Sequence, residues 1–203
     1  MILFTRDDIP CLPEGVHLAL ENIEATIEEA FLSEHEREEL DHMNHPDRRE
    51  EFLTGRKLFR DMIQKLGWDE HVADTLKDEM GRPWGEVNGE KVWLSFAHTG
   101  TYMLCALSWK RAIGVDIEAV NRKLPDRLKS RMLAEDESPE SPLIKIWTIK
   151  EAALKLKGTG LRSGLKNVKV ISEDTPGRLQ FSDDASCEFC TFEHKNHYIS
   201  LAF

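Results

Sequence analysis

The sequence predicts an α+β fold made of two halves, each with helices packed on an antiparallel sheet. In each half, segments with helical spacing of apolar residues precede segments in which apolar and polar residues alternate, and Gly and Pro residues separate them. A run of helices followed by a run of strands is typical of the α+β class. The 203 residues, 40% hydrophobic and 32% charged, suffice for one sizeable domain or two small ones. We place the N-terminal half at residues 1–108 and the C-terminal half at residues 109–203.

The first half is expected to contain two helices. Residues 33–43 have helical spacing, with Ser33 as the N-cap and Glu36 in the position that completes a capping box. Pro46 then reads as a break, and apolar residues at helical spacing predict a second helix over about 47–66. A turn-rich segment follows. Three strands are then expected to pair as a meander: residues 92–96, 102–107 and 113–117.

The second half repeats this order. A helical stretch is expected near residues 124–133, and a longer helix over 143–157 ends at Gly158, a residue suited to a left-handed C-cap. Alternating patterns then predict four strands: residues 168–171, 179–181, 187–192 and 198–203.

Composition excludes several classes of partner. The net charge of −10, from 27 basic and 37 acidic residues, argues against a general nucleic-acid or anionic-membrane binder. The N-terminus has no signal-peptide pattern, and the longest apolar stretch is too short to span a bilayer, so we expect a cytoplasmic protein. Four cysteines do not amount to a disulfide framework and fit a reducing compartment.

The segment Gly-Val-Asp-Ile-Glu at residues 114–118 carries two carboxylates on a predicted strand. Val115 and Ile117 alternate with the acidic residues, so Asp116 and Glu118 point to the same face, roughly 7 Å apart. Two carboxylates at this separation can share one hard cation.

The segment Trp-Thr-Ile-Lys-Glu-Ala-Ala-Leu-Lys at residues 147–155 lies on the predicted helix over 143–157. Glu151 and Lys155, four residues apart, share one face of that helix. Three carboxylates suit Mg²⁺, which favours phosphate oxygens as further ligands, and Lys150 and Lys155 suit the other phosphate oxygens. A polyphosphate substrate is therefore expected.

Together the two motifs resemble the signature of the 4'-phosphopantetheinyl transferases, and the position of the first motif past the middle of the chain resembles the longer Sfp-like branch. The resemblance implies Mg²⁺-dependent transfer of 4'-phosphopantetheine from coenzyme A to a serine of an apo acyl, peptidyl or aryl carrier protein, with release of 3',5'-ADP. It also implies a monomer of two similar halves, related by a pseudo-twofold axis, with the coenzyme between them.

The resemblance assigns roles to the motif residues. Asp116, Glu118 and Glu151 would ligate Mg²⁺, with Mn²⁺ as an alternative. Glu118 or Glu151 would take the proton of the serine, with Glu151 preferred because Lys155 lies beside it. Lys155 would neutralise charge on the phosphates or protonate the leaving group.

Further segments resemble the coenzyme-binding parts of the family. Residues 94–100 match a phosphate-binding segment through His98 and Thr99, whereas Ala97 replaces the usual serine. Arg82 matches the cation of a Gly-Lys-Pro turn, and Arg49 and Arg56 lie on the helix that contributes a basic residue to the 3'-phosphate in many members.

Basic residues follow the first motif. Arg122, Lys123 and Arg127 could meet the acidic recognition helix typical of carrier proteins, or form a solvated helix face. Two other functions remain open: a metal-dependent phosphohydrolase that activates water with the same carboxylates, and a non-catalytic relative that binds coenzyme A or a carrier protein.

Overall fold

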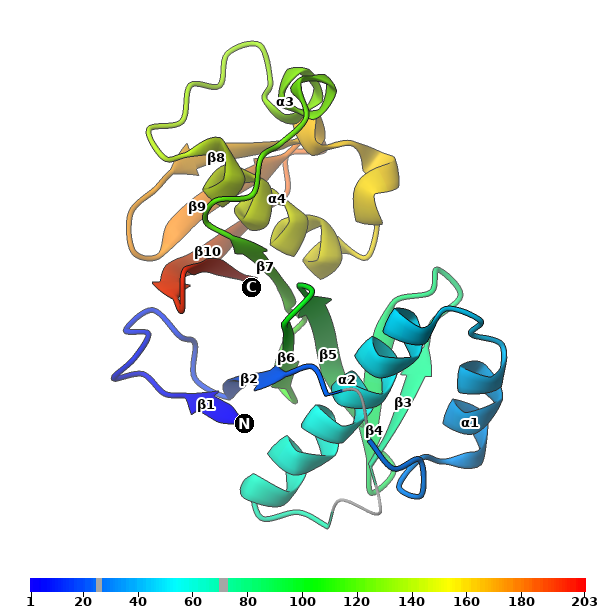
Figure 1. Ribbon diagram of the computed structural model, residues 1–203. Helices are drawn as coiled ribbons and strands as arrows, with labels where there is room; N and C mark the ends of the chain where they lie inside the picture. The colour runs from blue at the N-terminus through cyan, green and yellow to red at the C-terminus, as the bar shows by residue number, and fades with distance from the viewer. Residues whose placement is uncertain (25–26, 70–72) are drawn as a thin grey trace.

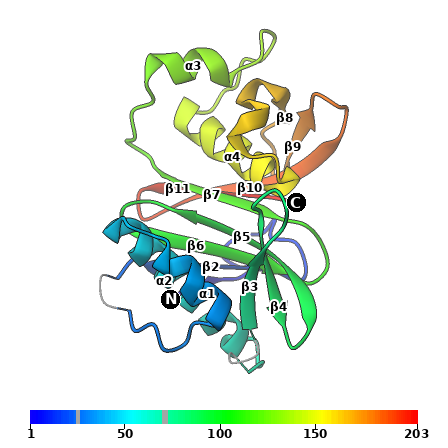
Figure 2. The same cartoon turned by 90° about the vertical axis from the view of Figure 1, so that its right-hand side faces the viewer.

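The computed structural model describes residues 1–24, 27–69 and 73–203. They form a helix, sheet, sheet, helix sandwich, in which the two sheets pack face to face and the long helices cover their outer faces (Figure 1, Figure 2). The described strands of both sheets pair antiparallel, so the predicted α+β class is confirmed.

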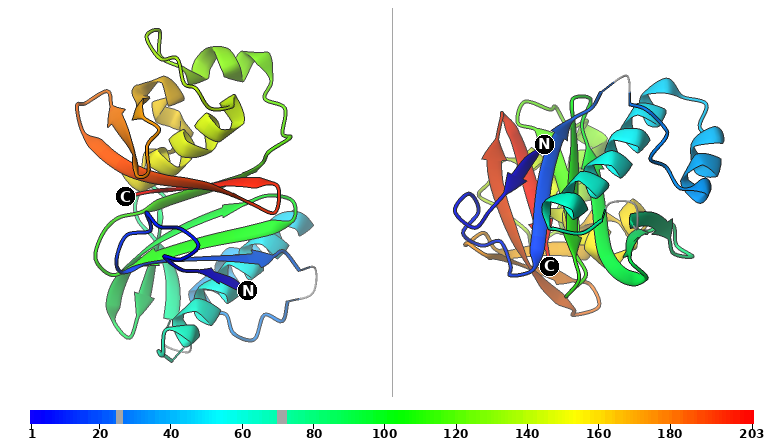
Figure 3. Two further views of the ribbon diagram at one scale, coloured as in Figure 1. Left: turned by 90° about the vertical axis from the view of Figure 1, so that its left-hand side faces the viewer. Right: turned by 90° about the horizontal axis from the view of Figure 1, so that it is seen from below.

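The first sheet is built from residues before 109 and has the order β1-β2-β6-β5-β4-β3. Helix α2 lies across its outer face, where it contacts β2 and β6 (Figure 3, right). The elements of this half are β1 (Ile2–Phe4), β2 (Val16–Asn22), α1 (Glu34–Asp41), α2 (Pro46–Lys65), β3 (Ala73–Lys77), β4 (Pro83–Val87), β5 (Glu90–His98) and β6 (Tyr102–Ser108).

The second sheet has the order β7-β11-β10-β9-β8, and helix α4 covers its outer face over β7 and β11. The elements of this half are β7 (Gly114–Ala119), α3 (Asp126–Met132), α4 (Leu143–Lys157), the short 3-10 helices η2 (Gly160–Ser163) and η3 (Leu165–Asn167), β8 (Val168–Ser172), β9 (Gly177–Phe181), β10 (Ser186–His194) and β11 (His197–Ala202).

Local sequence signals explain the helix ends. Ser33 caps α1, and Glu36 completes the capping box, as predicted. Pro46 does not break the chain but occupies the first turn of α2, where a residue without an N–H costs nothing. Gly158 caps α4 in the left-handed conformation at φ 75°, as predicted.

The expected meander of three strands is wrong at its third strand. β5 pairs with β6, but β7 pairs with β11 in the other sheet. β7 also packs against β5, and there the Val115 N–H donates to the Ser95 hydroxyl at 3.1 Å. Four strands, β1 to β4, were absent from the sequence prediction.

The core between the sheets positions β7. Val115 and Ile117 point into it together with Leu104 and Ala106 of β6 and Leu201 of β11. The alternate residues of β7 therefore face α4. Gly114 lies so close to that helix that a Cβ there would be 2.1 Å from the carbonyl oxygen of Ala152, so only glycine permits this approach.

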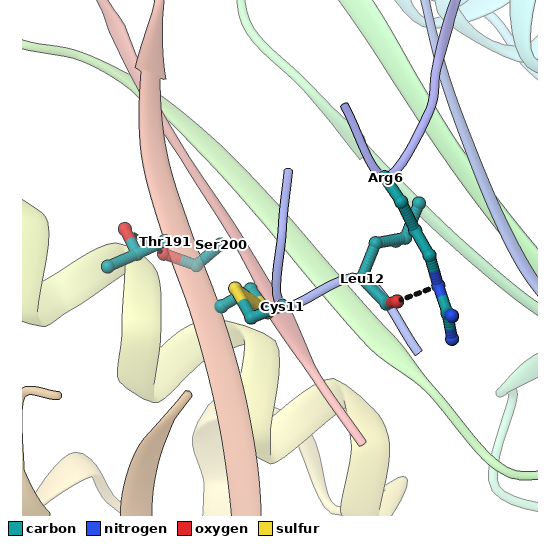
Figure 4. Close-up of a disulfide and its surroundings, with 6 residues drawn as sticks. Arg6, Cys11, Leu12, Thr191 and Ser200 are labelled. Carbon is teal, nitrogen blue, oxygen red and sulfur yellow. Dashed lines mark hydrogen bonds between the residues drawn. A yellow bond between two sulfur atoms is a disulfide. The ribbon is translucent and has the colours of Figure 1, made fainter. Parts of the chain in front are cut away.

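Contrary to the expectation of thiols alone, the structure joins Cys11 to Cys190 in a disulfide, with the Cα atoms 5.9 Å apart. It links the segment after β1 to β10 of the second sheet, and nearby the Arg6 Nε donates to the Leu12 carbonyl (Figure 4). Cys105 and Cys187 are free thiols.

Among the described residues, none of the helices is long and apolar enough to cross a bilayer.

Candidate functional site

Two adjoining cavities carry the predicted basic residues, the first between the halves and the second within the N-terminal half. The first, of about 450 Å³, is lined by the turn before β4, by β5 and by the C-terminal end of α4, and carries three cations: Arg82, Lys155 and Arg162. The second, of about 220 Å³, is lined mainly by α2 and β5 and carries the basic side chains Arg48, Arg56, Lys77 and His98 together with the acidic side chains Glu39 and Glu51. Pro83 and Phe96 border both cavities. The two groups of cations thus suit a ligand with two separated anionic parts.

Strand β7 presents the first acidic motif to α4. Because Gly114 packs against the backbone of α4, Asp116 on the same face of the strand meets the next turn of that helix. Asp116 Oδ1 accepts a hydrogen bond from Lys155 Nζ at 2.8 Å. The predicted strand and helix motifs are therefore brought together in the structure.

Two carboxylate oxygens at this contact are buried without a hydrogen-bond partner among the described residues. They are Oδ2 of Asp116 and Oε1 of Glu151, and both parent residues are less than 9% exposed. Leaving such oxygens unpaired costs on the order of 1–3 kcal/mol each, more when they are charged. A cation between them would remove this cost.

The two carboxyl groups also have raised pKa values. Burial raises the pKa of Asp116 above its usual range, opposed by Lys155. Burial, with the charge of Asp116 adding to it, raises the pKa of Glu151 to about 7, against the charges of Lys155 and Arg122. A group with this pKa can accept a proton near neutral pH.

Glu118, the third acidic residue, is paired with Arg122. The Arg122 guanidinium donates to Glu118 Oε1 and lies over the Trp147 ring of α4, 5.7 Å from its centroid. In this arrangement no cluster of three or more His, Cys, Asp or Glu side chains within residues 1–24, 27–69 and 73–203 is arranged as a metal site. The oxygen ligands still fit a divalent cation, because Asp116 and Glu151 each have one buried oxygen without a hydrogen-bond partner among the described residues.

Arg82 lies at the junction of the halves. Its guanidinium stacks over Trp93 of β5, 5.0 Å from the ring centroid, and its aliphatic part lies against Gly158 at the end of α4. One guanidinium nitrogen, Nη2, is buried without a partner, and burial lowers the pKa of Arg82. Arg82 and Lys155 therefore face the same cavity from opposite halves.

His98 lies in the second cavity at the end of β5. Its Nδ1 is 3.1 Å from Glu51 Oε1, and the ring is half exposed. The Thr99 hydroxyl accepts hydrogen bonds from the backbone N–H groups of Thr101 and Tyr102 and so stabilises the turn before β6. Ala97 packs in the core between the sheets, so its side chain does not face this cavity.

The two arginines predicted on α2 have different surroundings. Arg56 lines the second cavity, lies 3.9 Å from the centroid of the Phe52 ring, and has a pKa lowered by burial to about 10. Arg49 instead donates to the Leu40 carbonyl and to Glu29, away from the cavity. The neighbouring Arg48 lines the cavity in its place.

Lys150 is placed elsewhere than the sequence suggested. Its side chain is fully buried, and Nζ donates to Glu137 and to the Met132 carbonyl, the latter at 2.8 Å. Glu137 also accepts from the backbone N–H groups of Ala134 and Val170. The ammonium therefore anchors the loop after α3 and does not reach the cleft, because i and i+1 on a helix face different sides.

Among the predicted basic residues after β7, Arg122 and Lys123 border a shallow groove of about 340 Å³ between the start of α3 and the start of α4. Lys129 and the apolar Leu124 and Leu143 complete this groove. Arg127 is exposed on α3 beside it.

Sequence reasoning missed Glu51, Glu137, Arg48, Lys77 and Arg162. Each acts through a partner or cavity formed by segments distant in sequence, as with Glu51 and His98. No local spacing signals such a contact. Of these five residues, only Arg48 could have been found from the sequence, because it is adjacent to the predicted Arg49.

Comparison with known proteins identifies the family. The model of the 4'-phosphopantetheinyl transferase superfamily matches residues 112–202, which include β7 and α4. The chain is 26% identical to the 4'-phosphopantetheinyl transferase HetI of Nostoc sp. over 85% of this chain and 81% of that protein. It is 25% identical to a putative 4'-phosphopantetheinyl transferase of Synechocystis sp. over 77% of this chain and 68% of that protein.

A third relative is the holo-[acyl-carrier-protein] synthase of Staphylococcus carnosus. It is 35% identical over 36% of this chain and 69% of its own length. With the acidic strand, the motif helix and these matches in agreement, the chain belongs to the 4'-phosphopantetheinyl transferase superfamily.

Proposed function

We propose that this protein transfers the 4'-phosphopantetheine group of coenzyme A to a serine of an apo carrier protein and releases 3',5'-ADP. The observation that carries the proposal is the pair of adjoining cavities with separate groups of cations, next to buried carboxylates. Coenzyme A has two separated anionic parts, a pyrophosphate and a 3'-phosphate. The first cavity suits the pyrophosphate, since Lys155 lines it, and the second suits the 3'-phosphate.

The carboxylates support a divalent cation as cofactor. Asp116 and Glu151 would hold Mg²⁺ or Mn²⁺ with their unpartnered oxygens, and Glu118 would join them when released from Arg122. The bound ion would neutralise charge on the pyrophosphate. Lys155 Nζ donates to Asp116 Oδ1 at 2.8 Å, opposes the rise of the Asp116 pKa, and lines the first cavity.

Glu151 is the proposed base. Its raised pKa, about 7, allows it to accept the proton of the carrier serine at neutral pH. The serine oxygen forms a bond to the β-phosphorus as the bond to the oxygen of 3',5'-ADP breaks, and the serine proton passes to Glu151. Lys155 and Arg82 offset the negative charge on the leaving phosphate, which is the larger part of catalysis at phosphorus.

The carrier is proposed to approach along the groove bordered by Arg122 and Lys123. This groove begins directly after β7, beside the carboxylates, and combines positive charge with apolar residues. An acidic helix of a carrier protein has the complementary charge. We also propose that the protein is cytoplasmic and acts as a monomer. The monomer is supported because one chain supplies both groups of cations.

Intact-protein mass spectrometry of an apo carrier protein tests this function. With coenzyme A and Mg²⁺, the carrier should gain the mass of one phosphopantetheine group, and EDTA or the variant Glu151→Gln should abolish the gain. Release of 3',5'-ADP without a carrier would instead identify a phosphohydrolase. Binding of coenzyme A without transfer to any carrier class would identify a non-catalytic relative.

A further inference from the structure

Arg122 forms an ion pair with Glu118, an acidic residue that the proposed metal site requires. The chain turns at the end of β7, where the Arg122 N–H donates to the Ala119 carbonyl at 2.9 Å, and the side chain folds back onto Glu118. The guanidinium is held from the other side by the face of Trp147, a buried residue one turn before Glu151 on α4. Arg122 is therefore placed on the carboxylate cluster by contacts with both motifs.

The charges of the cluster are shared among five groups. Lys155 pairs with Asp116 and Arg122 pairs with Glu118, while Glu151 forms no ion pair with a cation in the part of the chain that the structure describes. Two cations therefore face three carboxyl groups in the cluster. Arg122 also brings its positive charge to the cluster, because its guanidinium lies on Glu118. A divalent cation entering the cluster meets this positive charge.

We propose that Arg122 is a tethered competitor of the divalent cation for Glu118, and that cation binding releases its side chain toward the carrier groove. This inference rests on the proposed function. The guanidinium donates to Oε1 of Glu118, and its positive charge would oppose a divalent cation at the same carboxylate. The Arg122 side chain is 42% exposed, so it can leave without opening the core.

The groove proposed for the carrier lies next to the Arg122 guanidinium. Arg122 already borders the groove that Lys123, Lys129, Leu124 and Leu143 complete. Once free of Glu118, it adds a forked donor suited to carboxylates of an acidic partner. Because coupling between two binding equilibria is reciprocal, the cation should strengthen carrier binding by the same factor by which the carrier strengthens cation binding.

Titration of the free protein with Mn²⁺, followed by the electron paramagnetic resonance signal of unbound Mn²⁺, tests the competition without any turnover. Arg122→Gln should bind Mn²⁺ about 2- to 5-fold more tightly than the wild type, the range expected for releasing a partly exposed ion pair. Arg122→Lys, which keeps the charge but not the fork, should lie between them. Lys123→Gln removes the same charge from the next position and should leave the Mn²⁺ affinity unchanged.

Equal Mn²⁺ affinity in the wild type and Arg122→Gln would overturn the competition, as would an equal gain in Lys123→Gln, which would show a general effect of net charge. Absence of Mn²⁺ binding in every variant, with and without coenzyme A, would overturn the metal assignment of the proposed function and the competition with it. In a second arm, Mn²⁺ should tighten binding of an apo carrier to the wild type, and this gain should be lost in Arg122→Gln. An equal gain in both proteins would overturn the release toward the groove.

Discussion

Lys155 Nζ lies 2.8 Å from Asp116 Oδ1, and this ion pair joins α4 to β7 at the edge of the first cavity. Replacement Lys155→Met should lower kcat for carrier modification by roughly 10²- to 10³-fold, the range for loss of a major electrostatic group. The protein should remain folded, because the raised pKa of Asp116 permits that carboxyl to become neutral when its partner is lost. Lys155→Arg, which keeps the charge, should retain more activity. Unchanged kcat in Lys155→Met would contradict the role.

The raised pKa of Glu151 makes stability depend on pH. In the folded state the carboxyl titrates at about 7, against 4.5 for an unperturbed glutamate, so the folded state binds the extra proton between these values. The free energy of unfolding should therefore fall as pH rises through this window, by up to about 3 kcal/mol above pH 7. Urea unfolding in EDTA should show Glu151→Gln gaining stability over the wild type between pH 5 and pH 8. A constant difference between the two proteins would contradict the shift.

The buried pair of Lys150 and Glu137 is expected to act on stability. Lys150→Met leaves Glu137 buried without its cation, which should cost about 3–5 kcal/mol in urea unfolding. The double variant Lys150→Met/Glu137→Leu should be more stable than Lys150→Met alone, since no charge is then left uncompensated. If Lys150→Met raised the KM for coenzyme A at unchanged stability, the result would favour the contact between Lys150 and phosphate that the sequence predicted.

Gly114 should tolerate no side chain. A Cβ at this position would lie 2.1 Å from the Ala152 carbonyl oxygen, so Gly114→Ala must push α4 away from β7. We expect a loss of about 1–3 kcal/mol in unfolding free energy. Turnover should fall as well, since the same contact aligns Asp116 with Lys155. Gly100→Ala is the matched control, because nothing lies within 4 Å of its added Cβ. Equal melting temperatures for the two variants would contradict the packing argument.

Charge reversal beside the groove should affect the carrier and not the coenzyme. Lys123→Glu and Arg127→Glu should each raise the KM for carrier protein several-fold and leave the KM for coenzyme A unchanged, mainly through a slower association rate. Arg178→Glu, at an exposed position of β9 in the second sheet, is the control. A similar increase for Arg178→Glu would mean that net charge alone is responsible, and equal effects on both substrates would place these residues at the coenzyme.

Local signals predicted the helices well. The capping box at Ser33 and the left-handed Gly158 fixed the start of α1 and the end of α4, because these signals act within a few residues of chain. Edge strands such as β1, with three residues, carry too few residues for a pattern. The prediction of strand pairing failed where pairing depends on distant segments, because β7 follows β6 in sequence but pairs with the C-terminal strand β11.

The sequence by itself determined the two motifs, the faces of β7 and α4 that carry Asp116, Glu118, Glu151 and Lys155, and the family that these motifs share. Those properties follow from the periodicity of a strand and a helix, which local residues set. Only the tertiary structure decided which charges meet. It placed Lys150 on Glu137, Arg122 on Glu118 and Glu51 beside His98, because burial and ion pairing depend on segments that approach each other only when both sheets are packed.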